Sequence, residues 1–238
     1  MPPQEGAALA RDIVDILGDV PRVETVLCPP AVTLMAVADA LRGSEIQLGA
    51  QNIHWENEGA YTGELSAAML AGWCSYVIIG HSERRQYFGE NDENVNRKVK
   101  AALAHELVPI ICVGENLIEN EADRTGEVVQ RQVYAAYGGL SADEALRTVV
   151  AYEPVWAIGG GRAATPGGAN SVCGAHVRAP LRELFGRDVS EAVRVQYGGS
   201  VTPDNIAHFM AEPHIDGALI GGASLSSQSF CAIVRRVV

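Results

Sequence analysis

The fold is indicated most clearly by residues 76–85, which read Tyr76-Val77-Ile78-Ile79-Gly80-His81-Ser82-Glu83-Arg84-Arg85. Four apolar residues in succession are typical of a strand that is buried on both faces of a parallel sheet. A glycine ends this run, and a histidine and a charged cluster follow at once. Polar groups that directly follow a buried strand lie where the catalytic groups of parallel barrels gather. Taken alone, the segment also fits a polar surface loop.

The pattern around this segment recurs along the chain as a short apolar run, a polar or glycine-rich break, and a longer run with apolar residues at helical spacing. It predicts parallel strands joined by helices. A helix over residues 5–17 is expected before the first strand. A closed barrel of this kind has eight strands and begins with a strand, so the set of strands expected here is one short. The expected strands span residues 23–28, 46–50, 76–80, 108–113, 148–152, 193–197 and 217–220.

Length and composition fit one globular domain over residues 1–238, with no linker or low-complexity tract. A net charge of −11 disfavours nucleic acid as a partner, and no apolar run is long enough to predict a membrane span. The five cysteines are scattered singly, which argues against a structural metal and for a reducing compartment. The amino terminus has no secretory pattern, so a cytoplasmic location is expected.

The second segment with chemical potential spans residues 149–161, where a β-branched run ends in Glu153. A carboxylate beside an apolar, water-excluding lid can have a raised pKa, which suits a general base at neutral pH. The alternative is a Glu that only caps the strand or lies exposed. Pro154 and Trp156 stiffen the start of the following loop, and Gly159 to Gly161 give it freedom, so a hinged lid is expected.

Paired glycines follow each of the last two expected strands, at Gly198-Gly199-Ser200 and Gly221-Gly222-Ala223-Ser224. Such pairs let backbone N–H groups approach an anion closely, and a helix that begins there adds its dipole. Parallel barrels often bind phosphate in these two loops. One such pair alone is more often a turn, whereas two at equivalent strand ends favour a phosphate site.

Taken together, these segments resemble the signature segments of the triosephosphate isomerases, in the family's order and spacing. The resemblance runs from about the first helix to the carboxyl terminus, and it includes Gln51-Asn52, Thr62-Gly63-Glu64 and Cys112-Val113-Gly114-Glu115. It implies an α/β fold of the (β/α)8 TIM-barrel type, here lacking the first β-strand. It also implies interconversion of dihydroxyacetone phosphate and D-glyceraldehyde 3-phosphate, a step of glycolysis and gluconeogenesis.

The resemblance implies residue roles as well. Glu153 would be the base that moves a proton between adjacent carbons, His81 the neutral electrophile at the developing enediolate, and Glu83 a supporting carboxylate. A lid over Gly159 to Ala164 would exclude water from the intermediate. Neither metal nor organic cofactor is implied, and the loop that holds Thr62 would dock into a second copy to form a homodimer. The phosphate would be held by Gly159, Ser200, Gly221 and Gly222.

One departure from the family is severe. Its members begin with a strand that ends in Asn-Trp-Lys-Met or a close variant, and Met1 falls just beyond that segment, so no residue aligns with the asparagine or the lysine. Losing one preorganised electrostatic partner typically costs about 10²- to 10³-fold in rate. Arg84 and Arg162 are the nearby cations by motif position. The two strands beside the gap would expose unpaired backbone groups. Partial closure, an intruding segment, a partner, or a natural start further upstream would cover them.

Three readings of function follow. The leading one is an isomerase of this family, impaired without the lysine strand. The second is a catalytically inactive phosphate-binding or interaction scaffold derived from the family. The third keeps the barrel but changes the substrate to another sugar phosphate, as in histidine or tryptophan biosynthesis. The segments around His81 and Glu153 favour the first reading over the third.

Overall fold

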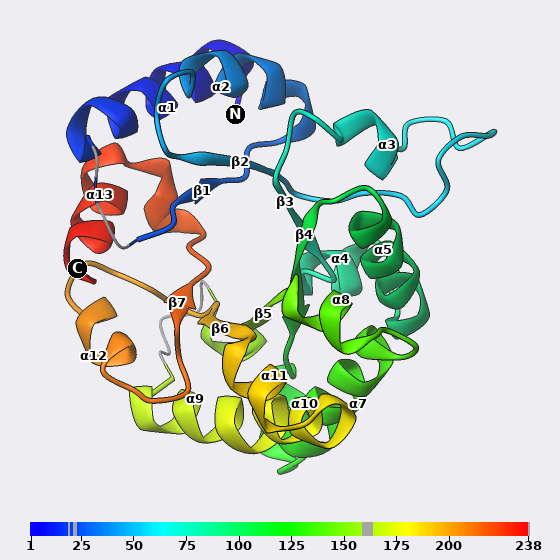
Figure 1. Ribbon diagram of the computed structural model, residues 1–238. Coiled ribbons are helices and arrows are strands. Elements are labelled where there is room, and N and C mark those ends of the chain that lie inside the picture. Colours follow the sequence, from blue (N-terminus) through cyan, green and yellow to red (C-terminus); the bar gives the residue numbers. More distant parts are fainter. Residues whose placement is uncertain (19, 21–22, 159–163, 238) are drawn as a thin grey trace.

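The computed structural model describes residues 1–18, 20, 23–158 and 164–237. Within these residues seven parallel strands form one curled sheet in chain order, and helices cover its outer side (Figure 1). Each predicted strand is present. The strands are β1 (Val26–Leu27), β2 (Gln47–Ala50), β3 (Tyr76–Ile79), β4 (Val108–Val113), β5 (Val149–Tyr152), β6 (Arg194–Tyr197) and β7 (Gly217–Ala218).

The helix predicted over residues 5–17 is also present and begins slightly earlier, at Pro3, a residue type favoured in the first helical turn. No helix in the described ranges has the length and apolar character needed to cross a membrane. The α-helices are α1 (Pro3–Leu17), α2 (Leu34–Ala40), α3 (Ala67–Leu70), α4 (Ser82–Tyr87), α5 (Asp92–Ala104), α6 (Leu117–Glu121), α7 (Thr125–Tyr137), α8 (Ala142–Leu146), α9 (Pro166–Val172), α10 (Ala179–Phe185), α11 (Arg187–Ala192), α12 (Ile206–Met210) and α13 (Ser227–Arg235). Shorter turns are η1 (Ala31–Thr33), η2 (Val155–Ala157) and η4 (Gly222–Leu225), and η3 (Cys173–Arg178) is a π-helical stretch between α9 and α10.

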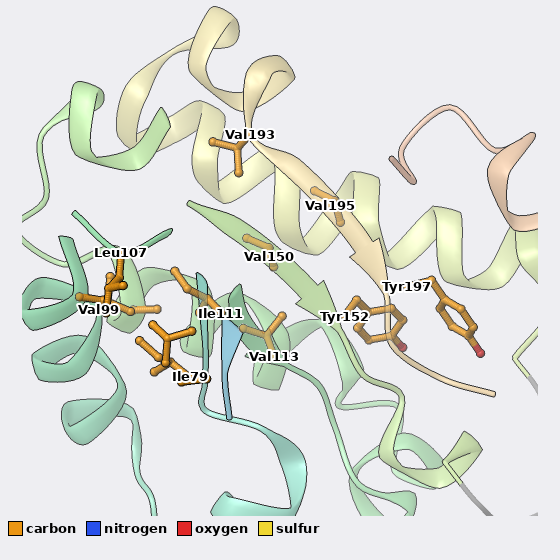
Figure 2. Close-up of a cluster of buried hydrophobic side chains, with 14 of the residues drawn as sticks. Ile79, Val99, Leu107, Ile111, Val113, Val150, Tyr152, Val193, Val195 and Tyr197 are labelled. Carbon is orange, nitrogen blue, oxygen red and sulfur yellow. The ribbon is translucent and has the colours of Figure 1, made fainter. Parts of the chain in front are cut away.

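The central strands are buried on both faces, as their apolar runs predict. Side chains alternate between the two faces of each strand. One set, which includes Ile79, Ile111 and Val150, packs against the helices (Figure 2). The other set, which includes Ile78 and Ile110, forms a smaller cluster inside the curl of the sheet. The two clusters hold the strands in register and place their carboxyl ends along one rim.

In the described residues the sheet is open at one place, between β1 and β7, which is consistent with a barrel that lacks its first strand. In the described part of the chain, β1 pairs only with β2 and β7 only with β6. Neither closure by β1–β7 pairing nor an intruding strand is found there. The helical layer continues across this gap, because α1 packs against both α13 and α2 (Figure 1).

The strands on either side of the gap are shorter than predicted, which corrects the expected ranges 23–28 and 217–220. β1 spans only Val26–Leu27 and β7 only Gly217–Ala218. Each has a neighbour on one side alone, so half of its possible ladder hydrogen bonds are not made.

A polar cluster ties three strands together at the amino-terminal end of the sheet. The Tyr76 hydroxyl and the Arg194 guanidinium both donate hydrogen bonds to the Glu24 carboxylate, and Arg194 also donates to the Tyr76 hydroxyl at 3.3 Å. Tyr76 begins β3, Arg194 begins β6, and Glu24 lies just before β1. The cluster therefore connects β1 with β6 although neither strand pairs with the other.

Candidate active site

His81 and Glu153 meet at the carboxyl-terminal rim of the sheet. Gly80 adopts a left-handed φ of 77° directly after β3 and turns the chain so that His81 caps α4. The His81 Nε2 lies 3.0 Å from Glu153 Oε1, and the Ser82 N–H donates to Glu153 Oε2 at 2.9 Å. The two residues that the sequence singled out independently are thus in direct contact.

Two opposing influences act on the pKa of His81. Burial lowers its pKa, but the hydrogen bond and charge of Glu153, helped by the charges of Glu83 and Glu90, outweigh burial and hold the pKa of His81 above its ordinary value. The Glu83 N–H donates to His81 Nδ1 at 3.3 Å, which suits the neutral tautomer with its proton on Nε2. The Glu83 carboxylate lies 3.9 Å from Nδ1, with a side chain that is 69% exposed.

Close backbone packing keeps the Glu153 carboxylate in place. Glu153 is only 2% exposed. A Cβ added at Gly114 would lie 1.8 Å from the Glu153 carbonyl oxygen, and one added at Gly198 would lie 2.9 Å from Glu153 Cγ. Burial, and next the charge of Glu153, raise the pKa of the Cys112 thiol well above its ordinary value, so a neutral thiol neighbours the carboxylate. Glycines on both neighbouring strand ends therefore make room for Glu153.

A second buried carboxylate at this rim, Glu115, was missed by sequence reasoning. It is fully buried and accepts hydrogen bonds from the Trp156 indole at 2.7 Å and from the Tyr152 hydroxyl at 3.2 Å. Through these contacts it holds the start of the loop that follows Glu153. Glu115 lies two residues after the end of β4, separated from it by Gly114. A carboxylate at the end of an apolar strand, the signal that identified Glu153, was therefore present here too.

The predicted phosphate ligands lie after β6 and β7, on the same rim. Ser200 is half-buried, and the exposed Gly221 and Gly222 have open space where a side chain would stand. Ser224 donates from both its N–H and its hydroxyl to the Gly221 carbonyl, which shapes the turn at η4. Gly159 and the expected lid residues 160–163 lie outside the described residues.

The cations near the site are engaged elsewhere. Arg84 donates to the buried Glu90 at 2.8 Å and stacks over the Phe88 ring. Lys98 is also buried and donates to Glu90 at 2.7 Å and to Asn52 at 2.7 Å. Glu90 in turn accepts the Gly80 N–H at 2.9 Å. These contacts support the turn before His81. Arg162, the other cation proposed from sequence, lies outside the described ranges.

No set of three or more His, Cys, Asp or Glu side chains in the described part of the chain is arranged to hold a metal ion. The groups at the rim are an imidazole, two buried carboxylates and backbone N–H donors. This set suits proton transfer together with anion binding.

Comparison with known proteins gives a consistent result. The family model described as triosephosphate isomerase matches residues 2–237. A triosephosphate isomerase of Carboxydothermus hydrogenoformans is 53% identical, over 98% of this chain and 93% of its own length. One of Moorella thermoacetica is 55% identical, over 95% of this chain and 92% of its own length.

Solved structures agree. The crystal structure of a triosephosphate isomerase from Bartonella henselae is similar, with a TM-score of 0.86 and 37% identity, over 98% of this chain and 92% of that one. The similarity thus extends over nearly the whole described fold.

Proposed function

This chain belongs to the triosephosphate isomerase family and is an isomerase, and from that premise we propose that it interconverts dihydroxyacetone phosphate and D-glyceraldehyde 3-phosphate by proton transfer through an enediolate. The observation that carries this proposal is the direct contact between the buried Glu153 carboxylate and His81 Nε2 at 3.0 Å. A base and a hydrogen-bond donor at that separation can act on adjacent atoms of one small substrate.

In the proposed reaction, Glu153 removes a proton from one substrate carbon and returns it to the next. The His81 Nε2–H donates to the substrate carbonyl and then to the enediolate oxygen. The same N–H now lies against Glu153, so a substrate carbonyl that replaces the carboxylate as its acceptor also frees Glu153 for the substrate. Glu83, at the other ring nitrogen, supports the orientation of the imidazole. This coupling makes substrate entry the event that activates the base.

The substrate phosphate binds at the glycine-rich loops in this proposal. Gly221 and Gly222 have open space where a side chain would stand, at the start of η4, and Ser200 follows β6 on the same rim. Gly159 is the fourth proposed ligand, in a lid over Gly159 to Ala164. Backbone donors suit this chain because they bind an anion without a formal cation, and its net charge is −11.

The proposal includes a reduced rate for these 238 residues alone, because they contain no counterpart of the family's lysine. Arg84 and Lys98 are both held by Glu90, which supports the view that neither takes over its role. A chain extended at its amino end by a strand that ends in Asn-Trp-Lys-Met is expected to turn over about 10²- to 10³-fold faster.

The test is a coupled isomerase assay with glyceraldehyde 3-phosphate on both chains, each with and without Glu153→Gln. We expect measurable turnover that rises with the added strand and is lost with Glu153→Gln in both backgrounds. If Glu153→Gln changes nothing in either chain, the inactive scaffold is the better account. Equal activity of the two unsubstituted chains would contradict the lysine argument alone.

We also propose a cytoplasmic homodimer. The segment between β2 and α3, which holds Thr62, projects from the body of the molecule (Figure 1). Tyr61 is 45% exposed and Phe88, after α4, is 68% exposed, as expected of side chains that a second copy covers.

Sedimentation equilibrium is expected to give the mass of two chains, and Thr62→Arg to reduce it, whereas Ser171→Arg on α9 leaves it unchanged. A single-chain mass at every concentration would refute the dimer.

A further inference from the structure

A cavity lies at the opposite end of the sheet from His81 and Glu153. It has a volume of about 390 Å³ and is bounded by η3 and α10, by α11, and by the segment that leads into β7. Asp216 lines it and immediately precedes β7, which puts the cavity at the amino-terminal end of the strands. This volume is within the range of small-molecule sites.

The floor of the cavity includes an arginine held rigidly by its neighbours. Arg178 is 9% exposed, and its Nη1 donates to the carbonyls of Ser190 at 2.6 Å and Val193 at 3.1 Å, while its Nη2 donates to Asp216 at 2.6 Å. A guanidinium has five N–H donors, so these three contacts leave two for a ligand. The same oxygen, Asp216 Oδ2, also accepts the Val195 N–H at 2.7 Å, and the ion pair with Arg178 offsets the negative charge of Asp216.

Two further arginines line the cavity. Arg182 follows Arg178 by one helical turn, and no acceptor for its guanidinium is found among the described residues. Arg187, on α11, pairs with Glu191 at 2.6 Å, but both side chains are mostly exposed. Exposed pairs of this kind contribute little, so Arg187 can turn to a ligand at small cost. The lining also contains two carboxylates, Glu191 and Asp216, so Arg182 supplies its excess positive charge, on a chain whose net charge is −11.

The π-helical stretch η3 brings a polar ring to the same cavity. Gly174 in η3 has no side chain, and a Cβ there would lie 2.5 Å from His214 Cδ2, so only glycine admits the imidazole at this place. The backbone N–H of His214 donates to Asn170 Oδ1 at 3.0 Å and fixes the segment before β7. π-Helical turns are rare and are often found at functional sites.

We propose that this cavity is a second anion site, distinct from the rim at His81, and that it binds a compact polyanion with two phosphate groups. Arg182 and Arg187 lie on separate helices and each contacts one phosphate group. Arg178, fixed by its backbone acceptors, orients the ligand between them. The planar fork of an arginine matches phosphate oxygens in pairs, and two such forks on separate helices favour a ligand with two phosphate groups over one with a single group.

The test is calorimetric titration of the full chain with inorganic diphosphate at constant ionic strength. We expect one binding event to weaken about 100-fold in the double variant Arg182→Gln/Arg187→Gln, since each lost charge-assisted contact accounts for about tenfold. The control, Arg42→Gln/Arg124→Gln, removes the same charge from two exposed arginines elsewhere on the surface, each of which pairs with an acidic side chain as Arg187 does. It is expected to bind as the unsubstituted chain does.

Labelling of arginines with phenylglyoxal, mapped by mass spectrometry, shows where diphosphate binds. Diphosphate is expected to protect Arg182 and Arg187, and to leave Arg42 and Arg124 reactive. The proposal is overturned if diphosphate does not bind, if binding is equal in the double variant and the unsubstituted chain, or if the control loses as much affinity. Any diphosphate bound at the carboxyl-terminal rim would persist in both variants and protect neither cavity arginine.

Discussion

At the scale of single residues, the contact between His81 and Glu153 determines the chemistry of the rim. The carboxylate favours the charged imidazole, whereas burial and the Glu83 N–H favour the neutral one. The neutral form is the one that the proposed mechanism uses. A substrate that separates the pair therefore also removes the group that raises the pKa of His81.

The first prediction concerns that pKa. In Glu153→Gln the largest raising influence is lost, while burial and the smaller contributions of Glu83 and Glu90 remain, so the pKa of His81 is expected to fall. The measurement is an NMR titration of the His81 ring, assigned with His81→Gln.

Because the folded-state pKa is raised in the unsubstituted chain, His81 stabilises the fold below its unfolded pKa. This contribution is lost as pH rises through the folded value. An unchanged titration in Glu153→Gln would show that Glu153 is not the cause.

The second prediction concerns Gln196, whose Oε1 is buried and has no hydrogen-bond partner among the described residues. It pairs with Gly217 of β7, beside the open edge of the sheet. A buried acceptor without a donor costs about 1–3 kcal/mol, so Gln196→Met is expected to raise the free energy of unfolding by about 1 kcal/mol. Urea denaturation measures it. Gln4→Met, at an exposed position on α1, is the control and is expected to change stability by less than about 0.5 kcal/mol. A loss of stability in Gln196→Met would mean that the amide is satisfied.

At the scale of elements, the close approach of the carboxyl ends of β4 and β5 positions the site. Gly114 follows β4 and approaches the backbone of Glu153 so closely that no side chain fits between them. Glu115, one residue later, holds Tyr152 and Trp156 on either side of Glu153. The end of one strand thus supports the catalytic end of the next.

The third prediction tests this close approach. Gly114→Ala would place a Cβ 1.8 Å from the Glu153 carbonyl oxygen, so β4 and β5 must separate. We expect a loss of at least about 3 kcal/mol in the free energy of unfolding, measured by urea denaturation. Gly167→Ala in α9 meets no atom within 4 Å and serves as the matched control, with an expected gain of about 0.5–1 kcal/mol. Equal effects at the two positions would rule out the close approach.

At the scale of the whole molecule, the helical layer is continuous where the sheet is open. α1 bridges α13 and α2, whereas β1 and β7 each have a free edge in the described residues. The cluster of Glu24, Tyr76 and Arg194 adds a link between β1 and β6 at the amino-terminal end. The space between the two free edges is therefore bounded by helix on its outer side, which suits one more extended segment.

The fourth prediction is that an added amino-terminal strand protects these edges. Amides of β1 and β7 are expected to exchange with solvent more slowly in the extended chain, because unpaired N–H groups gain acceptors. Hydrogen exchange measured by NMR gives the rates for each residue. Amides of β4, which already has neighbours on both sides, serve as the internal control. Unchanged exchange in β1 and β7 would mean that the added segment does not enter the sheet.

The sequence by itself determined the seven strand segments, their alternation with helices, and the positions of His81 and Glu153 at strand ends. These features follow from short-range periodicity and from where polar residues interrupt buried runs, which act within a few residues. Only the tertiary structure decided that His81 and Glu153 touch, that Glu115 holds Trp156, that Gln196 Oε1 has no partner among the described residues, and that β1 and β7 are short. Each of these depends on how distant strands lie beside one another, and that register is set by packing across the whole sheet, which no local pattern contains.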